Sequence, residues 1–148
     1  MANFFTITST TALLLALTAL SSCSDDNADI TVTLPKNINN FISLYYPGTA
    51  VSATSLDNGI YTVDLRDSAS LSFDFSGEWI SVNGRGSTLP EIFLYDKMPE
   101  KLYQYLTSTS NLSSVYVAAR NSKTYSLTLT DSEISYDIAS GNVSYITD

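Results

Sequence analysis

The sequence predicts an α+β protein built from two tandem modules, each a helix packed on a four-stranded antiparallel β-meander. Three observations predict this class. The chain repeats itself at an offset of 64 positions, as from Leu34-Pro35 to Met98-Pro99. Each copy opens with a proline followed by apolar residues at helical spacing. Each then continues with runs in which apolar and polar residues alternate, as in strands with one buried face.

The two copies correspond in their turn residues as well as in their apolar residues. The corresponding pairs are Ile38/Leu102, Phe41/Tyr105, Ile42/Leu106, Tyr61/Tyr125, Val63/Leu127, Leu65/Leu129, Asp67/Asp131, Ser68/Ser132 and Gly77/Gly141. Around Leu71 and Phe73 the match slips by one position, to Ile134 and Tyr136. The slip predicts a one-residue difference in a hairpin turn. Because proline, glycine and Asp-Ser punctuation repeats together, we interpret the pattern as a true duplication.

Residues 1–22 are predicted to be a lipoprotein signal peptide. A short apolar stretch, residues 12–20, leads into Ser21-Ser22-Cys23, which resembles a bacterial lipobox. The apolar stretch is far shorter than the roughly 20 residues that span a bilayer as a helix. Cys23, the only cysteine, is therefore expected to be lipidated and to become the mature N-terminus. The polar and acidic residues 23–29 then form a solvated tether.

Residues 30–83 are predicted to be the first module. Ile38, Phe41 and Ile42 fall on one face of a helix that Pro47-Gly48 ends. Strands follow, with buried residues alternating with Thr62, Asp64, Ser72 and Asp74 on the opposite face; the residues expected to be buried are Tyr61, Val63, Leu65, Leu71, Phe73 and Phe75. Asp57-Asn58-Gly59 is a turn signal between two of these strands.

Residues 84–97 are predicted to be a linker with a short helix, and residues 98–148 the second module. The apolar run Leu89 to Tyr95 is too substantial for a free linker, so it packs against one module or bridges both. In the second module Leu102, Tyr105 and Leu106 repeat the helical stripe. Its strands repeat the alternation and are separated by Gly141-Asn142.

Charge and composition exclude several kinds of function. The net charge of −8 argues against a nucleic-acid partner, because binding phosphates requires Lys and Arg. The chain has no histidine, which removes Ser-His-Asp and Cys-His catalysis and histidine metal sites. The carboxylates show no calcium-loop spacing. We therefore expect no enzyme activity, no metal site and no cofactor.

The residues at the helix ends and turns of the first copy resemble those of a known family. Leu34-Pro35, the helix ending at Tyr45-Tyr46-Pro47-Gly48, and the motif Asp74 to Trp79 resemble the PepSY-like, β-lactamase-inhibitor-protein-like family of secreted or lipidated bacterial proteins. The second copy departs from the pattern, with Val143 at the tryptophan position. The resemblance implies tandem copies of one fold and a non-catalytic protein- or peptide-binding role, with inhibition of the bound protein as one form of it.

Exposed aromatic residues are the candidates for binding that partner, because they offer large contact area at a small entropic cost. Tyr46 and Tyr103 fall off the helical stripes, and Tyr116 alternates out of register with the apolar residues on either side of it. Trp79 is a fourth candidate, with a core or module-junction position as its alternative reading. Separately, Asp67-Ser68-Ala69 resembles a short O-glycosylation acceptor motif of envelope proteins, which makes Ser68 a candidate modification site.

We therefore expect a lipid-anchored protein of the cell envelope, attached through Cys23. Acidic residues directly after the cysteine resemble an export tag to the outer face of the outer membrane, so a surface-exposed outer-membrane lipoprotein is the predicted location. Its expected role is to bind a protein or peptide. The alternative is a structural or accessory subunit of a surface assembly for glycan capture or adhesion.

Overall fold

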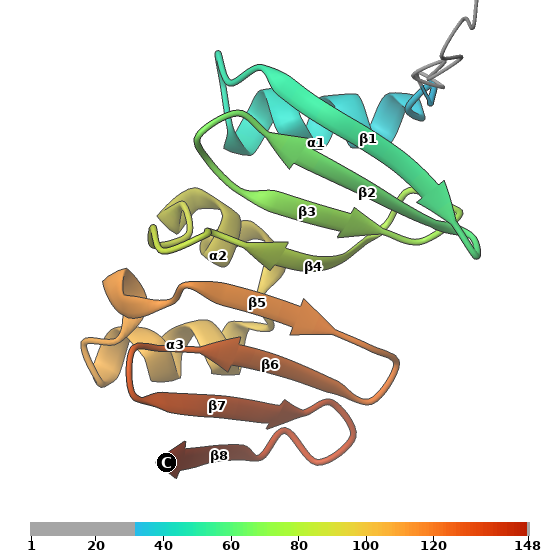
Figure 1. Cartoon of the computed structure of the whole chain (residues 1–148). Helices are drawn as coiled ribbons and strands as arrows, with labels where there is room; N and C mark the ends of the chain where they lie inside the picture. The colour runs from blue at the N-terminus through green and yellow to red at the C-terminus, as the bar shows by residue number, and fades with distance from the viewer. Residues whose placement is uncertain (1–31, 148) are drawn as a thin grey trace, which may run out of the picture.

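The computed structural model describes residues 32–147 as a single antiparallel sheet with helices on one side (Figure 1). Cys23 and the predicted signal peptide and tether lie outside the described residues. The elements in chain order are α1 (Lys36–Tyr45), β1 (Val51–Asp57), β2 (Ile60–Leu65), β3 (Ser70–Phe73), β4 (Trp79–Asn83), α2 (Glu91–Lys97), α3 (Glu100–Ser108), the 3-10 turn η1 (Leu112–Ser114), β5 (Val117–Arg120), β6 (Thr124–Thr128), β7 (Ser132–Asp137) and β8 (Val143–Thr147).

The prediction that each module has its own four-stranded sheet is wrong. The last strand of the first copy, β4, pairs with the first strand of the second copy, β5, and the eight strands form one sheet in the order β1 to β8. At this junction Ser81 lies opposite Ala119 and Val82 lies opposite Ala118. Pairing satisfies the backbone groups that two separate sheets would leave open at their edges. Of the predicted fold class, only the mixture of α-helices and β-strands is confirmed.

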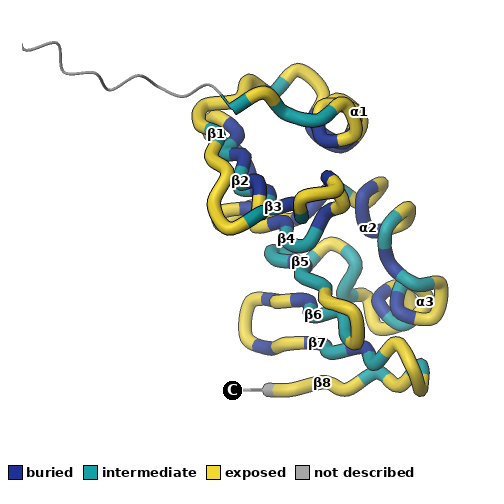
Figure 2. Tube along the Cα trace, turned by 90° about the vertical axis from the view of Figure 1, so that its right-hand side faces the viewer, coloured by how far each residue is buried: buried dark blue, intermediate teal, exposed yellow. Residues whose placement is uncertain are grey.

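The three α-helices within residues 32–147 lie on the same side of the sheet, and no part of these described residues covers the other side, which we call the uncovered face (Figure 2). The helix α1 follows Pro35 and buries Ile38, Phe41, Ile42 and Tyr45, the spacing of a single helical face. The helix α3 follows Pro99 and buries Leu102 and Leu106. No helix within residues 32–147 has the length and apolar character required to cross a membrane.

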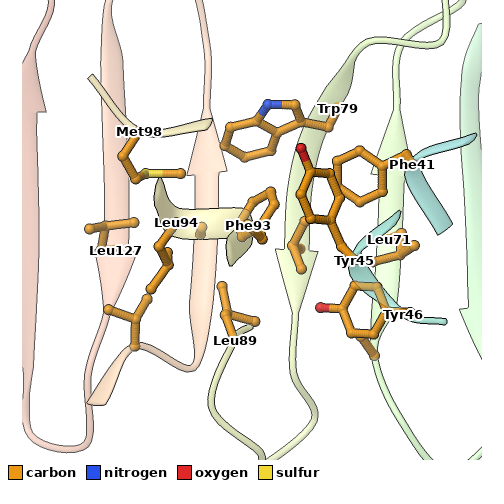
Figure 3. Packing of buried hydrophobic residues seen from close by; sticks show 14 of the residues in the cluster. Phe41, Tyr45, Tyr46, Leu71, Trp79, Leu89, Phe93, Leu94, Met98 and Leu127 are labelled. Carbon is orange, nitrogen blue, oxygen red and sulfur yellow. The ribbon is translucent and has the colours of Figure 1, made fainter. Parts of the chain in front are cut away.

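A continuous core lies between the helices and the sheet, and α2 contributes to it where the two copies meet (Figure 3). Phe93 of α2 is fully buried. Its ring centroid lies 5.7 Å from that of Phe41, 5.6 Å from that of Tyr45 and 5.1 Å from that of Trp79. Trp79 also faces Tyr125 of β6, with the ring centroids 6.1 Å apart. An aromatic cluster therefore joins α1, α2, β4 and the second copy.

The duplication is visible in the order of elements, and the predicted slip has a structural origin. Half one comprises α1 and β1 to β4, and half two comprises α3 and β5 to β8. The β2–β3 turn, from Asp64 to Ser70, is one residue longer than the β6–β7 turn, from Thr128 to Glu133, and this is where the match slips. The β7–β8 turn, from Tyr136 to Val143, is one residue longer than the β3–β4 turn, from Phe73 to Trp79, and this restores the match at the glycines.

Candidate functional site

The uncovered face of the sheet carries small polar side chains from one edge to the other. Residues on adjacent strands that lie directly opposite one another share a face of the sheet. One row of such neighbours crosses all eight strands and is almost entirely hydroxyl-bearing. It consists of Ser55, Thr62, Ser72, Ser81, Ala119, Ser126, Ser135 and Ser144. The row passes through the β4–β5 junction without interruption, so both halves contribute to one surface.

A second row runs beside the first on the same face and carries its charges. It consists of Ala53, Asp64, Ser70, Asn83, Val117, Thr128, Glu133 and Ile146. Arg85, in the β4–β5 connection, forms an ion pair of 2.5 Å with Asp64, and Ser70 donates a hydrogen bond of 2.7 Å to the same carboxylate oxygen. Because the pair is partly exposed, it adds little stability. Together with Glu133, this pair supplies the charges of the second row.

A small cavity opens on the helical side, where α1 meets the β3–β4 turn and the end of α2. Its volume is about 200 Å³. Its lining combines three aromatic residues with amides and two opposite charges: Asn37, Asn40, Phe41, Leu44, Tyr45, Gly77, Glu78, Trp79 and Lys97. The Tyr45 hydroxyl donates a hydrogen bond of 3.2 Å to Asp96, and burial together with this carboxylate raises the Tyr45 pKa to about 12. The hydroxyl is therefore neutral at physiological pH and does not serve as a base.

Two acidic side chains with lowered pKa values, Asp74 and Asp137, act as turn caps. One Asp74 oxygen accepts hydrogen bonds from the Ser76 hydroxyl at 2.6 Å and from the Ser76 and Glu78 amides at 2.9 and 3.0 Å. Asp137 accepts the amide and hydroxyl of Ser140 at 2.7 Å in the equivalent turn. The serine hydroxyls in particular lower the pKa of both carboxyls. Each is thus held ionised, which is the opposite of what a general acid requires.

The four aromatic candidates do not form one patch. Trp79 is buried in the core, where Arg120 lies over its ring at 5.0 Å and donates a hydrogen bond of 2.7 Å to its carbonyl. Tyr46 is also buried, and its hydroxyl has no hydrogen-bond partner among the described residues. Tyr103 and Tyr116 are half-buried. Tyr103 lies on α3, on the helical side of the sheet, where its ring packs edge-on against Tyr95 at 5.3 Å.

Ser68, the predicted O-glycosylation site, occupies the tight turn between β2 and β3. It is half-buried, and its amide faces the Leu65 carbonyl at 3.4 Å. Asp67 before it has a φ of 52°, which an aspartate tolerates better than most residues. The structure thus places the hydroxyl at a turn on the surface of half one.

Sequence reasoning identified the polar positions of the uncovered face strand by strand but missed the continuous surface. The missing information was the β4–β5 pairing, which alternation within a strand does not encode. In the described part of the chain, no three acidic or cysteine side chains come close enough together to hold a metal ion.

Comparison with known proteins identifies relatives of the same architecture. Residues 27–75 and 59–143 match the model of a family described as beta-lactamase-inhibitor-like and PepSY-like. A Bacteroides vulgatus protein of the DUF2874 family, named as periplasmic, is 25% identical with a TM-score of 0.64, over 78% of this chain and 91% of its own. A second Bacteroides vulgatus protein, named as periplasmic and of unknown function, is 25% identical with a TM-score of 0.61, over 76% and 92%.

A third relative supports the fold alone. A Bacteroides thetaiotaomicron protein named as calcium-regulated and periplasmic is 20% identical, with a TM-score of 0.66, over 80% of this chain and 93% of its own. No curated protein matches the chain.

Proposed function

Because the chain belongs to the PepSY-like, beta-lactamase-inhibitor-like family, we propose that it is a non-catalytic binding protein of the cell envelope that holds a protein or peptide against the uncovered face of its sheet. The family suggests a non-catalytic binding role, and similar solved structures are named as periplasmic proteins. The observation that carries the choice of surface is the row of small residues across all eight strands, all of them hydroxyl-bearing except Ala119. Such a face offers hydrogen-bonding groups without bulky side chains that would hold a partner away.

The proposed binding mode follows from the chemistry of this face. Serine and threonine hydroxyls both donate and accept hydrogen bonds, so they suit peptide groups and polar side chains alike. The Asp64–Arg85 ion pair and Glu133 would orient the partner rather than supply most of the affinity. By analogy with the name of the family, we propose that the partner is an enzyme of the envelope and that binding restrains it.

Attachment through Cys23 completes the proposal. A lipid on this residue would hold the sheet at the membrane, most simply at the outer membrane and exposed on the cell surface, with residues 23–29 as the spacer. The periplasmic names of the similar structures support export from the cytoplasm. Replacing Cys23 with Ser should release the protein from the membrane fraction or block its processing. Membrane attachment and processing that are unchanged in Cys23→Ser would refute the anchor while leaving the binding face untouched.

Site-specific photo-crosslinking in living cells tests the binding face. A crosslinker at Ser72 or Ser126, at the centre of each half of the uncovered face, should capture one and the same protein. The same crosslinker at Gln104, exposed on α3, is the matched control and should not capture it. Capture from the helical side but not from the sheet would refute the chosen surface. Capture of many different surface proteins at both sheet positions would favour the accessory-subunit alternative.

A further inference from the structure

In the part of the chain that the structure describes, no further strand pairs with either edge of the sheet, and both edge strands are nearly free of charge. The edge strand β8 contains no charged residue, and β1 contains one, Asp57 at its end. Soluble proteins usually protect such edges with charged side chains, prolines or bulges, because unpaired backbone groups bind other strands. Here β1 has one bulge, next to Val51, and the pairing of β7 with β8 is regular.

Apolar side chains at both edges are left half-exposed on the helical face. Leu56 lies opposite the buried Tyr61 and is 43% exposed, and Tyr145 lies opposite the buried Ile134 and is 49% exposed. At the β4–β5 junction Val82, the equivalent of Tyr145, is fully buried, and Arg120, the equivalent of Leu56, is half-buried. The difference arises because the junction strands each have a neighbour on both sides, and the edge strands have only one.

The pairing between the two halves of the chain indicates which strand would pair with each edge. Within the chain, the last strand of half one pairs antiparallel with the first strand of half two. Since β8 is the counterpart of β4, and β1 the counterpart of β5, the same pairing can be repeated between two copies of the chain. We propose that β8 of one copy pairs with β1 of the next, so that copies associate head to tail.

The register of this contact follows from the internal junction. Ser81 faces Ala119 and Val82 faces Ala118. The equivalent positions place Ser144 opposite Ser55 of the next copy, and Tyr145 opposite Thr54. Val143 then faces Leu56, which gives an apolar cross-strand pair on the helical side. The hydroxyl row continues from Ser144 to Ser55 of the next copy, so the proposed binding face extends from copy to copy.

The net charge of −8 weakens this association at low ionic strength. Two acidic copies repel each other at long range, although the strands that meet carry a single charged residue, Asp57. Salt screens that repulsion and leaves backbone hydrogen bonds and apolar contacts in place. The association should therefore strengthen as ionic strength rises, unlike a contact held by opposite charges.

Disulfide trapping between separate copies tests the pairing and its direction. The full chain with Cys23→Ser is prepared in mild detergent, so that one engineered cysteine is the only thiol. Mixing Ser55→Cys with Ser144→Cys should form a disulfide-linked dimer, because directly opposed positions place the two sulfurs within bonding distance. We expect it to form about tenfold faster than in a mixture of Ser55→Cys with the exposed control Gln104→Cys, because pairing raises the effective concentration.

The separate samples distinguish the proposed contact from the alternatives. Neither Ser55→Cys alone nor Ser144→Cys alone should crosslink at this rate, whereas a chain with both cysteines should form a ladder of oligomers. Adding Ile146→Lys to the Ser144→Cys copy should abolish the product while circular dichroism remains unchanged, since Ile146 is 51% exposed. Rapid crosslinking of Ser144→Cys with itself, or a mixture no faster than the control, would overturn the proposal. The face-specific crosslinking to an envelope protein would be unaffected by either result.

Discussion

Half one and half two share one plan but differ in how much aromatic core they hold. In half one, Phe41, Tyr45 and Trp79 surround Phe93 of α2. In half two, Val143 occupies the position of Trp79 and is only half-buried. Half two thus obtains part of its packing from its neighbour, through the contact of Trp79 with Tyr125. The two halves therefore depend on each other for their core packing, although the sequence repeat suggests two independent modules.

The largest expected effect comes from removing the side chain that joins the halves. Phe93→Ala should lower the free energy of unfolding by about 3–5 kcal/mol, because it empties the centre of the aromatic cluster. Chemical denaturation followed by circular dichroism measures this. Phe75→Ala is the matched control, since Phe75 is 73% exposed and should change little. Equal effects for the two substitutions would show that the cluster does not stabilise the fold.

Substitution by alanine should destabilise the protein more at Gly77 than at Gly141, the equivalent glycine of half two. Both have positive φ, 80° at Gly77 and 68° at Gly141. A Cβ at Gly77 would lie 2.4 Å from the Asn37 amide, which is held by a hydrogen bond to Ser76, whereas at Gly141 it would meet the flexible end of Lys101 at 3.1 Å.

We expect Gly77→Ala to cost roughly 2–3 kcal/mol and Gly141→Ala about 1 kcal/mol. Denaturation midpoints of the two variants provide the comparison. A larger loss in Gly141→Ala would mean that α1 can move away from the turn more easily than Lys101 can.

Acid should weaken both turns that the aspartates cap. The folded-state pKa values of Asp74 and Asp137 are lowered, so their stabilisation is present above the unfolded value of about 3.9 and is lost as the pH falls through the folded values. The melting temperature should therefore drop below about pH 4, and the double substitution Asp74→Asn with Asp137→Asn should flatten the drop. An unchanged acid profile in the double variant would assign the sensitivity to other groups.

The smallest expected effect is a gain. The Tyr46 hydroxyl is buried without a hydrogen-bond partner among the described residues. Tyr46→Phe should therefore raise the free energy of unfolding by up to about 1 kcal/mol, because it removes an uncompensated polar group. Tyr45→Phe, which loses the hydrogen bond to Asp96, should lower it by about the same amount. If Tyr46→Phe lowers the free energy of unfolding as much as Tyr45→Phe does, the Tyr46 hydroxyl has a hydrogen-bond partner in solution.

Local patterns in the sequence predicted the elements, and non-local contacts account for what they missed. The stripe from Ile38 to Tyr45 is a property of one helix and can be read from spacing alone. The burial of Tyr46 cannot be read from spacing, because the helix ends at Tyr45 and Tyr46 has non-helical backbone angles, with φ −132° and ψ 54°. Likewise, no local pattern encodes the pairing of Ser81 with Ala119 that joins the two halves of the uncovered face.

The central claim is that the duplicated halves fold as one unit around a shared sheet. Urea denaturation followed by two-dimensional NMR tests it most directly, with the amides of Leu71 in β3 and Ile134 in β7 reporting on the two halves. The shared β4–β5 pairing and the Phe93 cluster predict that both amides lose their native signals at the same midpoint, and that Phe93→Ala lowers both midpoints together. Two separate midpoints, with only that of Leu71 moved by Phe93→Ala, would contradict the claim.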